Sequence, residues 1–239
     1  MVLFVLIVYF ALISTKKAEQ NKVWVGLSKE TAHQLGTPIS SLMAWMDLLE
    51  SSGVDSSLLS DMNKDVNRLS VIAERFSKIG SKPEMELIYV NEVLENATEY
   101  MRRRVSDKVL ITTHLPSDAE GAMVCLSLFE WVIENLCKNA VDAMNGEGRI
   151  DVYMTSEKQQ IYIDIKDTGK GIARKNFKTV FNPGYTTKKR GWGLGLTLAK
   201  RIIEDYHAGR IYVKDSEVGK GTTLSLIHIS EPTRLDVIS

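Results

Sequence analysis

The stretch from Glu30 to Leu49 reads ETAHQLGTPISSLMAWMDLL, and its apolar residues recur at alternating steps of three and four. The recurring positions are Leu35, Ile39, Leu42, Met46 and Leu49. Side chains at this spacing line one face of an α-helix, as in helices that pack together in bundles. We therefore predict an amphipathic helix from about Val23 to Glu50, with the recurring residues as its buried seam.

A second stretch repeats this spacing after a turn. Gly53-Val54-Asp55 forms a turn after the first helix, and Asp55 or a following serine is placed to cap the next one. The second seam consists of Leu59, Met62, Val66, Leu69, Ala73 and Phe76. Two helices alone cannot enclose a core. We therefore predict that hairpins from two subunits form a four-helix bundle and that the chain is a homodimer.

His33 lies two residues before Leu35, off the seam, and is expected to point to solvent. Thr37 comes four residues later and shares the same outer face. Pro38 removes a helical hydrogen bond and favours a local kink beside the histidine. An exposed imidazole at such a place is accessible to a phosphoryl donor, although most surface histidines on helices have no such role.

Charge and cysteine content exclude some classes of function. The 239 residues include 30 Lys and Arg and 30 Asp and Glu, so bulk electrostatics give no reason to expect nucleic acid as a partner. Cys125 and Cys137 lack the spacing of metal ligands and are expected to be reduced thiols in a core.

The first residues form a separate element. Val2 to Ile13 is an almost unbroken apolar run, followed by Lys16 and Lys17. The run is shorter than the ~20 residues that a bilayer span needs. We interpret residues 1–16 as the end of a truncated membrane helix with its lysines on the cytoplasmic side. An interfacial anchor and a buried strand are the alternatives.

The pattern changes beyond the linker Ser81-Lys82-Pro83. Apolar alternation predicts strands at 86–90, 108–115, 149–155, 160–166, 210–214 and 222–227. Helical spacing predicts helices at 91–104, with Asn91 as a cap, at 126–144 and at 194–206. Helices mixed with hairpin-linked strands predict a two-layer α/β sandwich in which helices cover one sheet.

Two motifs in this second region are suited to hold a nucleotide and its cation. Asn135 and Asn139 lie about one helical turn apart, so their amide oxygens share a face and could hold Mg²⁺. Asp167-Thr168-Gly169-Lys170-Gly171 directly follows a predicted strand. Its carboxylate can accept a hydrogen bond from a purine amino group, and its glycines permit close backbone approach. Helix-surface asparagines and an acidic turn are the ordinary interpretations of the two motifs.

A third motif, Gly191-Trp192-Gly193-Leu194-Gly195-Leu196, opens a predicted helix. Bare backbone amides at a helix N-terminus bind phosphate. The spacing matches neither the dinucleotide fingerprint nor a Walker A motif. The polar stretch 182–190 before it has the composition of a lid over a triphosphate, with Lys188 as a candidate phosphate contact.

In this order the motifs resemble those of the sensor histidine kinases of two-component systems. His33 with Thr37-Pro38 resembles the phosphoacceptor motif of that family. The positions that resemble its nucleotide-binding boxes are Asn135-x-x-x-Asn139-Ala140, Asp167-x-Gly169-x-Gly171, Phe181, Gly191-x-Gly193-x-Gly195-Leu196 and Gly219-x-Gly221-Thr222. The resemblance covers about Val23 to Leu226.

The resemblance implies a multidomain α and α+β fold. Residues 17–82 would form the antiparallel helical hairpin of a dimeric four-helix bundle. Residues 83–228 would form a Bergerat-type α/β sandwich, the catalytic domain that binds ATP. Residues 1–16 would be the truncated membrane helix, and 229–239 an atypical tail of foreign appearance. The implied location is cytoplasmic domains anchored at a bacterial inner membrane.

The family transfers the γ-phosphate of ATP to histidine and then to an aspartate of a response regulator, and phosphatase activity toward that partner also occurs. The resemblance therefore implies a protein histidine kinase that uses ATP and Mg²⁺, with His33 as phosphoacceptor and Asn139 and Asn135 as metal ligands. Asp167 would contact adenine. The other implied nucleotide contacts are Asp142, Gly169, Gly171, Tyr185, Thr187, Lys188, Gly191, Gly193, Leu194, Gly195, Leu196 and Thr222.

Two features depart from the family pattern. An acidic residue commonly follows the phosphoacceptor and assists proton removal, but Gln34 stands here and cannot act as a base. Either Glu30 or ATP itself would replace it, or phosphorylation would be slower, because general-base help is worth about 10²–10⁴-fold. Gln34 and Thr37 could also position water for removing phosphate from the partner. The end of the chain, residues 227–239, fits nothing expected of the family.

Two other functions remain open. The same pocket occurs in gyrase and MutL, ATP-gated clamps that carry a water-activating glutamate four residues before the magnesium asparagine. Here that position is Asn135, and Glu134 points about 100° around the helix, which favours transfer to a side chain over hydrolysis. A degenerate kinase that binds ATP and only scaffolds is the other alternative, with Gln34 as its support.

Overall fold

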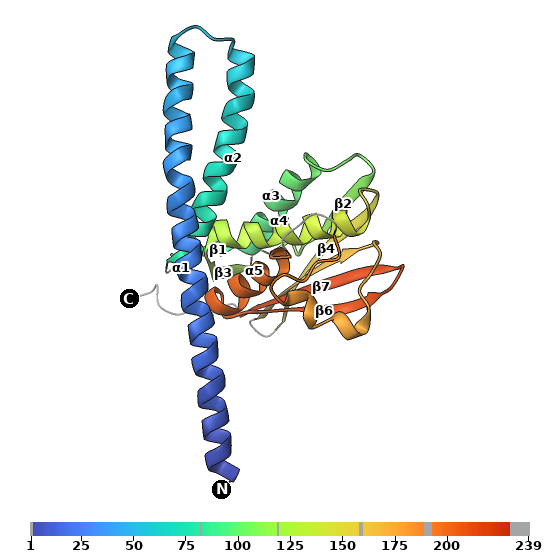
Figure 1. Cartoon of the computed structure of the whole chain (residues 1–239). Coiled ribbons are helices and arrows are strands. Elements are labelled where there is room, and N and C mark those ends of the chain that lie inside the picture. The colour runs from blue at the N-terminus through green and yellow to red at the C-terminus, as the bar shows by residue number, and fades with distance from the viewer. Residues whose placement is uncertain (1, 82, 119, 158–159, 189–192, 230–239) are drawn as a thin grey trace, which may run out of the picture. The chain divides into compact units, whose positions relative to one another are not determined.

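The structure is a computed structural model that describes residues 2–81, 83–118, 120–157, 160–188 and 193–229. The chain divides into two compact units, 1–83 and 84–239 (Figure 1). The expected tail from residue 230 onward, Gly191, and the end of the expected lid at 189–190 lie outside the described residues.

The first unit is a helical hairpin of α1, Val2–Ser51, and α2, Ser56–Gly80. Asp55 caps α2 as predicted, because its carboxylate accepts a hydrogen bond from the Ser57 N–H at 2.7 Å. α1 begins at Val2 rather than near Val23, since neither Gly nor Pro interrupts the sequence between these residues. Within the part of the chain that the structure describes, no helix combines the length and apolar character needed to cross a bilayer.

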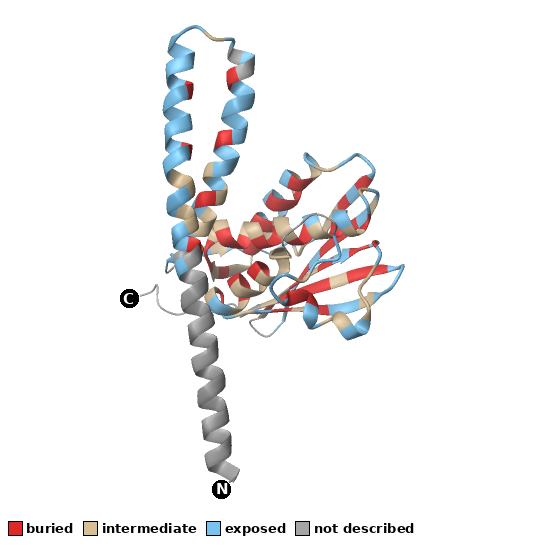
Figure 2. Cartoon of the chain, viewed as in Figure 1, coloured by how far each residue is buried: buried red, intermediate tan, exposed pale blue. Residues whose placement is uncertain are grey.

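The hairpin buries only part of its predicted seam. Figure 2 shows the buried positions on the sides of α1 and α2 that face each other. The buried cluster consists of Ile39, Met46, Val66 and Ala73, with Leu35 packed against it. Other seam residues stay 36–42% exposed, namely Leu42, Leu49, Met62 and Leu69. The hairpin therefore carries an apolar surface that its own two helices do not cover.

The second unit is built on a mixed sheet. Its strands are β1 Glu86–Tyr89, β2 Val109–His114, β3 Gly121–Val124, β4 Gly148–Glu157, β5 Gln160–Asp167, β6 Arg210–Glu217 and β7 Gly221–Ile229. Among the described residues, five strands form one sheet in the order β2-β4-β5-β7-β6, and β1 pairs with β3. β2 and β4 are parallel, and the other pairs are antiparallel.

Helices cover one face of the larger sheet (Figure 1). They are α3 Val90–Arg102, α4 Leu126–Ala143 and α5 Gly195–Arg201, with short turns η1 Arg174–Asn176, η2 Thr179–Phe181 and η3 Ile202–Tyr206. α4 packs on β4, β5 and β7. Leu136 and Cys137 in the middle of α4 are fully buried, and burial raises the pKa of the Cys137 thiol to about 12. The predicted two-layer arrangement is therefore confirmed for this unit.

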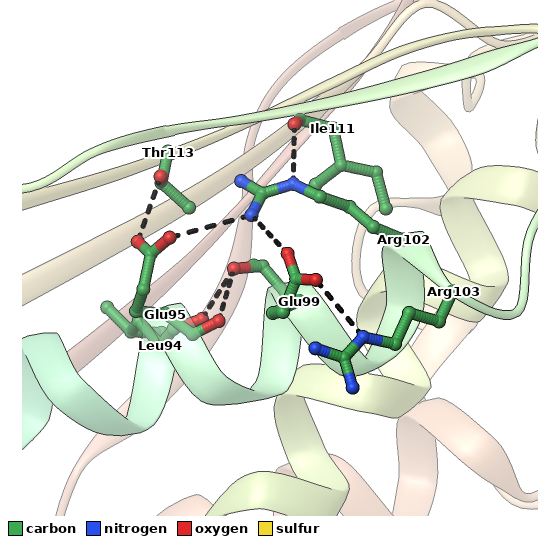
Figure 3. Close-up of polar contacts among 8 residues, drawn as sticks. Leu94, Glu95, Glu99, Arg102, Arg103, Ile111 and Thr113 are labelled. Atoms are coloured by element: carbon green, nitrogen blue, oxygen red, sulfur yellow. Dashed lines mark hydrogen bonds and ion pairs between the residues drawn. The ribbon is translucent and has the colours of Figure 1, made fainter. Parts of the chain in front are cut away.

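Charged side chains attach α3 to the edge strand β2 (Figure 3). Arg102 Nε donates to the Ile111 carbonyl at 3.1 Å, and its Nη1 pairs with Glu99 at 3.1 Å and Glu95 at 3.5 Å. Glu95 also accepts a hydrogen bond from the Thr113 hydroxyl at 3.1 Å. The Arg102 guanidinium therefore hydrogen-bonds a backbone carbonyl of the edge strand, to which another strand could otherwise bind.

The N-terminus of α3 differs from the prediction. Asn91 does not cap the helix, which begins at Val90, and Tyr89 stands at the cap position without a side-chain hydrogen bond. The Val90 N–H instead donates to the Glu120 carbonyl at 2.9 Å, so the neighbouring chain takes the place of a capping side chain. β3, which follows Glu120, was not predicted.

The helix predicted over 194–206 also changes character along its length. Its α-helical part ends at Arg201, and the rest is the π-helical turn η3. His207 is buried, and its Nδ1 lies 2.8 Å from the Ile202 carbonyl. The His207 backbone N–H also donates to the Ile202 carbonyl at 3.2 Å, and this bond between residues five apart defines the π-helical turn.

Candidate functional site

Asp167 ends β5 with a buried carboxylate that is only 6% exposed. Its Oδ1 accepts the Gly169 N–H at 2.8 Å. Burial raises the pKa of Asp167, and hydrogen bonds from the N–H groups of Gly169 and Thr222 oppose that rise. A buried carboxylate at a strand end is costly unless donors satisfy it, so this position is suited to an additional donor from a ligand.

The two glycine-rich turns form one compact structure around Asp167. Gly171 has φ +71°, and a Cβ there would collide with the Glu217 carbonyl oxygen. Gly221 has φ +123°, and a Cβ there would collide with the carbonyl oxygen of Asp167. The Gly219 N–H donates to the Lys170 carbonyl at 2.8 Å. Only glycine permits this close approach, so the first and third predicted glycine motifs are brought together.

Gly169 brings the same turn against the end of α4. A Cβ at Gly169 would lie 2.7 Å from the Ala143 carbonyl carbon, and the Lys170 N–H donates to the Ala143 carbonyl at 3.0 Å. Ala143 follows Asp142 directly, so the aspartate turn and the asparagine face of α4 are adjacent.

Asn139 and Asp142 both contact the ammonium group of Lys188. Lys188 Nζ lies 3.0 Å from Asn139 Oδ1 and 2.5 Å from Asp142 Oδ2. Asn139 Nδ2 is buried and has no hydrogen-bonding partner among the described residues. Because this amide oxygen and this carboxylate oxygen already contact an ammonium group, they could also serve as oxygen ligands of a metal cation.

Asn135 has a different role from Asn139 in this structure. Its Nδ2 donates to the Gly195 carbonyl at 2.8 Å, and a Cβ at Gly195 would lie 2.7 Å from its Oδ1. Asn135 thus connects α4 to the first turn of α5. Leu194, at the N-cap of α5, and Leu196 are half-buried beside this contact. The two asparagines predicted as a pair therefore contact different segments.

The described part of the expected lid, 182–188, has polar contacts to the rest of the unit. The Gly184 N–H donates to the Gly193 carbonyl at 3.2 Å. The hydroxyl of Thr187, an exposed residue, accepts from Lys170 Nζ at 2.8 Å. Tyr185 is half-buried. Phe181 is buried before this segment, and its carbonyl accepts from the Thr197 hydroxyl at 3.0 Å. These contacts hold 182–188 close to the Gly169 turn and to α5.

Ser216 is the site residue that sequence reasoning missed. Its hydroxyl lies among Ile172, Gly221 and Thr222, between the two glycine turns. A single serine near a strand end carries no motif, and its proximity to Gly219-x-Gly221-Thr222 was the only signal available.

His33 belongs to the first unit. His33 and Thr37 are both exposed on α1, as the seam predicts. The Thr37 hydroxyl lies 3.5 Å from the His33 carbonyl oxygen, a long hydrogen bond. Gln34 Nε2 donates to Glu30 Oε1 at 2.6 Å, so the glutamine next to the histidine is held by a carboxylate one helical turn earlier.

Metal-ligand clusters give no alternative site. Among the described residues, no group of three or more His, Cys, Asp and Glu could hold a metal ion.

Known proteins resemble this chain in both sequence and fold. Residues 126–233 match the family described as "Histidine kinase-, DNA gyrase B-, and HSP90-like ATPase". Sporulation kinase E of Bacillus subtilis (strain 168) is 29% identical over 226 residues, which cover 92% of this chain and 30% of that protein. Sensor histidine kinase ZraS of Escherichia coli (strain K12) is 26% identical over 218 residues, covering 88% of this chain and 46% of that protein. The chain thus spans less than half the length of these relatives.

A solved structure extends the likeness of fold to both units. Histidine kinase ThkA, determined in complex with response regulator protein TrrA, matches 95% of this chain and 67% of its own chain, with a TM-score of 0.60 at 17% identity. At this identity the match shows the fold alone. The ATPase match implies that the second unit binds ATP, and together with the kinases among the relatives it supports a sensor histidine kinase.

Proposed function

We propose that the chain is a histidine kinase core that phosphorylates His33 from ATP and passes the phosphoryl group to an aspartate of a response-regulator receiver domain. The observation that carries the proposal is the exposure of His33 on the face of α1 opposite the buried cluster. The ATPase match supplies the donor, and the ThkA complex with a response regulator supports the type of partner.

The reaction breaks the bond between the γ-phosphorus and the oxygen that bridges it to the β-phosphate, and ADP leaves. A P–N bond forms at an imidazole nitrogen of His33, and the ring proton is released. Gln34 cannot accept that proton, whereas the Glu30 carboxylate lies one turn away and already accepts from Gln34 at 2.6 Å. We assign Glu30 or an ATP phosphate oxygen as the proton acceptor. In the second step an aspartate oxygen of the partner attacks phosphorus, and His33 is regenerated.

The second unit would hold ATP through groups that fit it. Asp167 would accept a hydrogen bond from the adenine amino group, because its carboxylate is buried. Burial raises its pKa, and the hydrogen bonds from backbone N–H groups oppose that rise. Lys188 would pair with phosphate. Asn139 would bind Mg²⁺ through Oδ1, which already faces an ammonium group. Asn135 is the weaker metal ligand, since its amide is engaged with Gly195. When bound in such a site, Mg²⁺ would neutralise part of the negative charge of the phosphates.

The first unit supports a homodimer in this proposal. Leu42, Leu49, Met62 and Leu69 are apolar, exposed and in line with the buried cluster. A second hairpin would cover these side chains and complete a four-helix bundle. Attachment to a membrane through residues 1–16 is part of the same proposal and rests on their apolar sequence alone.

Labelling tests the proposal. With γ-labelled ATP and Mg²⁺ the chain should gain an acid-labile, base-stable phosphate, and His33→Gln should abolish it. His114→Gln is the matched control, because His114 also has an exposed side chain but lies in the second unit. Label that survives His33→Gln refutes the acceptor. ATP hydrolysis by the wild type without any labelled histidine would favour an ATP-gated clamp.

A further inference from the structure

A bulge in β6 brings Ser216 opposite Thr222, the cross-strand partner of Asp167. Val213 pairs with Leu224 and Asp215 pairs with Thr223, so Lys214 is the extra residue in the ladder. An extra residue reverses which side chains point to each face of a strand. Without it Asp215 would stand opposite Thr222, and with it Ser216 does. The bulge thus places a neutral hydroxyl, rather than a second carboxylate, opposite Thr222, which is the cross-strand partner of Asp167.

The Ser216 hydroxyl joins both glycine turns. It accepts the Ile172 N–H at 2.7 Å and lies 2.9 Å from the Gly221 carbonyl oxygen and 3.0 Å from Thr222 Oγ1. A hydroxyl offers one proton and two lone pairs. Donation to Gly221 and acceptance from Ile172 and Thr222 use all three.

These contacts reach Asp167 through its neighbours. Thr222 pairs with Asp167 across β5 and β7, and its N–H is one of the groups that lower the pKa of that carboxyl. Ile172 follows the turn that begins at Asp167. The Ser216 hydroxyl therefore links Ile172 to Thr222 and sets the spacing between the two chain segments that flank the Asp167 carboxylate.

We propose that Ser216 is a positioning residue for adenine recognition: by fixing the 167–172 turn against Thr222, it holds the Asp167 carboxylate where the purine amino group is bound. Ser216 does not touch the base itself. This inference rests on the proposed role of Asp167 in binding ATP. A serine that only stabilises the fold would affect all nucleotides alike, whereas a positioning serine affects the contact to the amino group.

A double-mutant cycle between protein and ligand separates these two roles. The full chain, as wild type and as Ser216→Ala, is titrated with ATP and with purine riboside triphosphate, which lacks the 6-amino group. Wild type should prefer ATP by about tenfold or more, the worth of a hydrogen bond to a charged group. Ser216→Ala should reduce that preference to about twofold, and Ser216→Thr, which keeps the hydroxyl, should restore most of it.

Thr98→Ala is the matched control. Thr98 is fully buried, and its hydroxyl donates to the Leu94 carbonyl at 2.8 Å on α3, away from both turns. The Thr98→Ala substitution also removes a hydroxyl that is hydrogen-bonded within the protein, and it should leave the preference for ATP unchanged. If Ser216→Ala does not fold, Ser216→Cys, whose thiol is a weak donor and acceptor, replaces it in the same cycle.

The outcomes distinguish this inference from the proposed function. An unchanged preference in Ser216→Ala, with wild type still preferring ATP, overturns the role of Ser216 and leaves Asp167 as the base contact. Equal affinity of wild type for both nucleotides overturns the role of Asp167, and the inference about Ser216 falls with it. A reduced preference in Thr98→Ala as well would make the effect one of general stability.

Discussion

The two units of this chain bury apolar side chains to very different extents. On α4, Leu136 is fully buried, whereas on α1 Trp45 is 65% exposed and Leu48 56% exposed. The second unit encloses a large core within one chain, while the hairpin buries few residues and exposes large apolar side chains along both helices. The difference teaches that one unit is complete by itself and that the other has a surface suited to a partner.

The largest effect is expected where burial is complete. Leu136→Ala should lower the free energy of unfolding of the second unit by about 3 kcal/mol, because it removes a buried side chain and leaves a cavity. Leu110→Ala, at a position 61% exposed on β2, should change it by less than about 0.5 kcal/mol. Urea unfolding followed by near-ultraviolet circular dichroism measures both. Equal losses would remove the contrast.

The hairpin should respond through assembly instead. Leu42→Glu combined with Leu49→Glu should weaken the proposed dimer by about 100-fold or more, since carboxylates would be buried without partners in the bundle. Sedimentation equilibrium measures the dissociation constant. The control is Ser40→Glu with Ser51→Glu, which adds the same charge at exposed positions on the opposite face of α1. A dimer that both double variants leave intact would contradict the predicted interface.

A smaller effect is expected within the second unit, at its polar segment 182–188. Lys188→Met removes the contacts to Asn139 and Asp142 and should speed amide hydrogen exchange of this segment by about tenfold in the nucleotide-free protein. Lys175→Met is the control, because Lys175 is exposed and carries the same charge. Unchanged exchange in Lys188→Met would mean that other contacts hold the segment.

The smallest effect is a pH dependence of the second unit. Burial lowers the pKa of His207, while its hydrogen bond with the Ile202 carbonyl acts in the opposite direction. As the pH falls below about 6.5, His207 is therefore protonated in the unfolded chain before it is protonated in the folded protein. Stability is fully present above that pH and declines below it, by at most about 1.4 kcal/mol per pH unit.

Thermal unfolding from pH 7.5 to pH 5 measures this decline. Protonation would also take away the lone pair of Nε2 that accepts the Cys125 N–H at 3.1 Å. His207→Gln should be less stable at neutral pH but should lose the contribution of this ring to the slope. A slope that His207→Gln leaves unchanged would assign the pH dependence to other groups.

Periodicity predicted the features that depend on local spacing. The seam around Ile39 correctly placed His33 outward, and the glycine motifs marked turns where a Cβ would collide with neighbouring backbone. The separation of Asn135 from Asn139 was not predictable, because it depends on where α5 begins in space. Ser216 was hidden for a similar reason, since only the pairing register reveals the bulge at Lys214.

The buried cysteines of the second unit have a practical consequence. Cys125 and Cys137 are both buried and free, and these are the two cysteines of the sequence. A thiol buried in a core reacts slowly with electrophilic probes. A cysteine introduced at an exposed position of each unit, such as Ser51 and Lys175, would therefore take a dye or spin label selectively while the native thiols stay in place. The separation between the helical hairpin and the second unit then becomes a distance that can be measured with and without ATP.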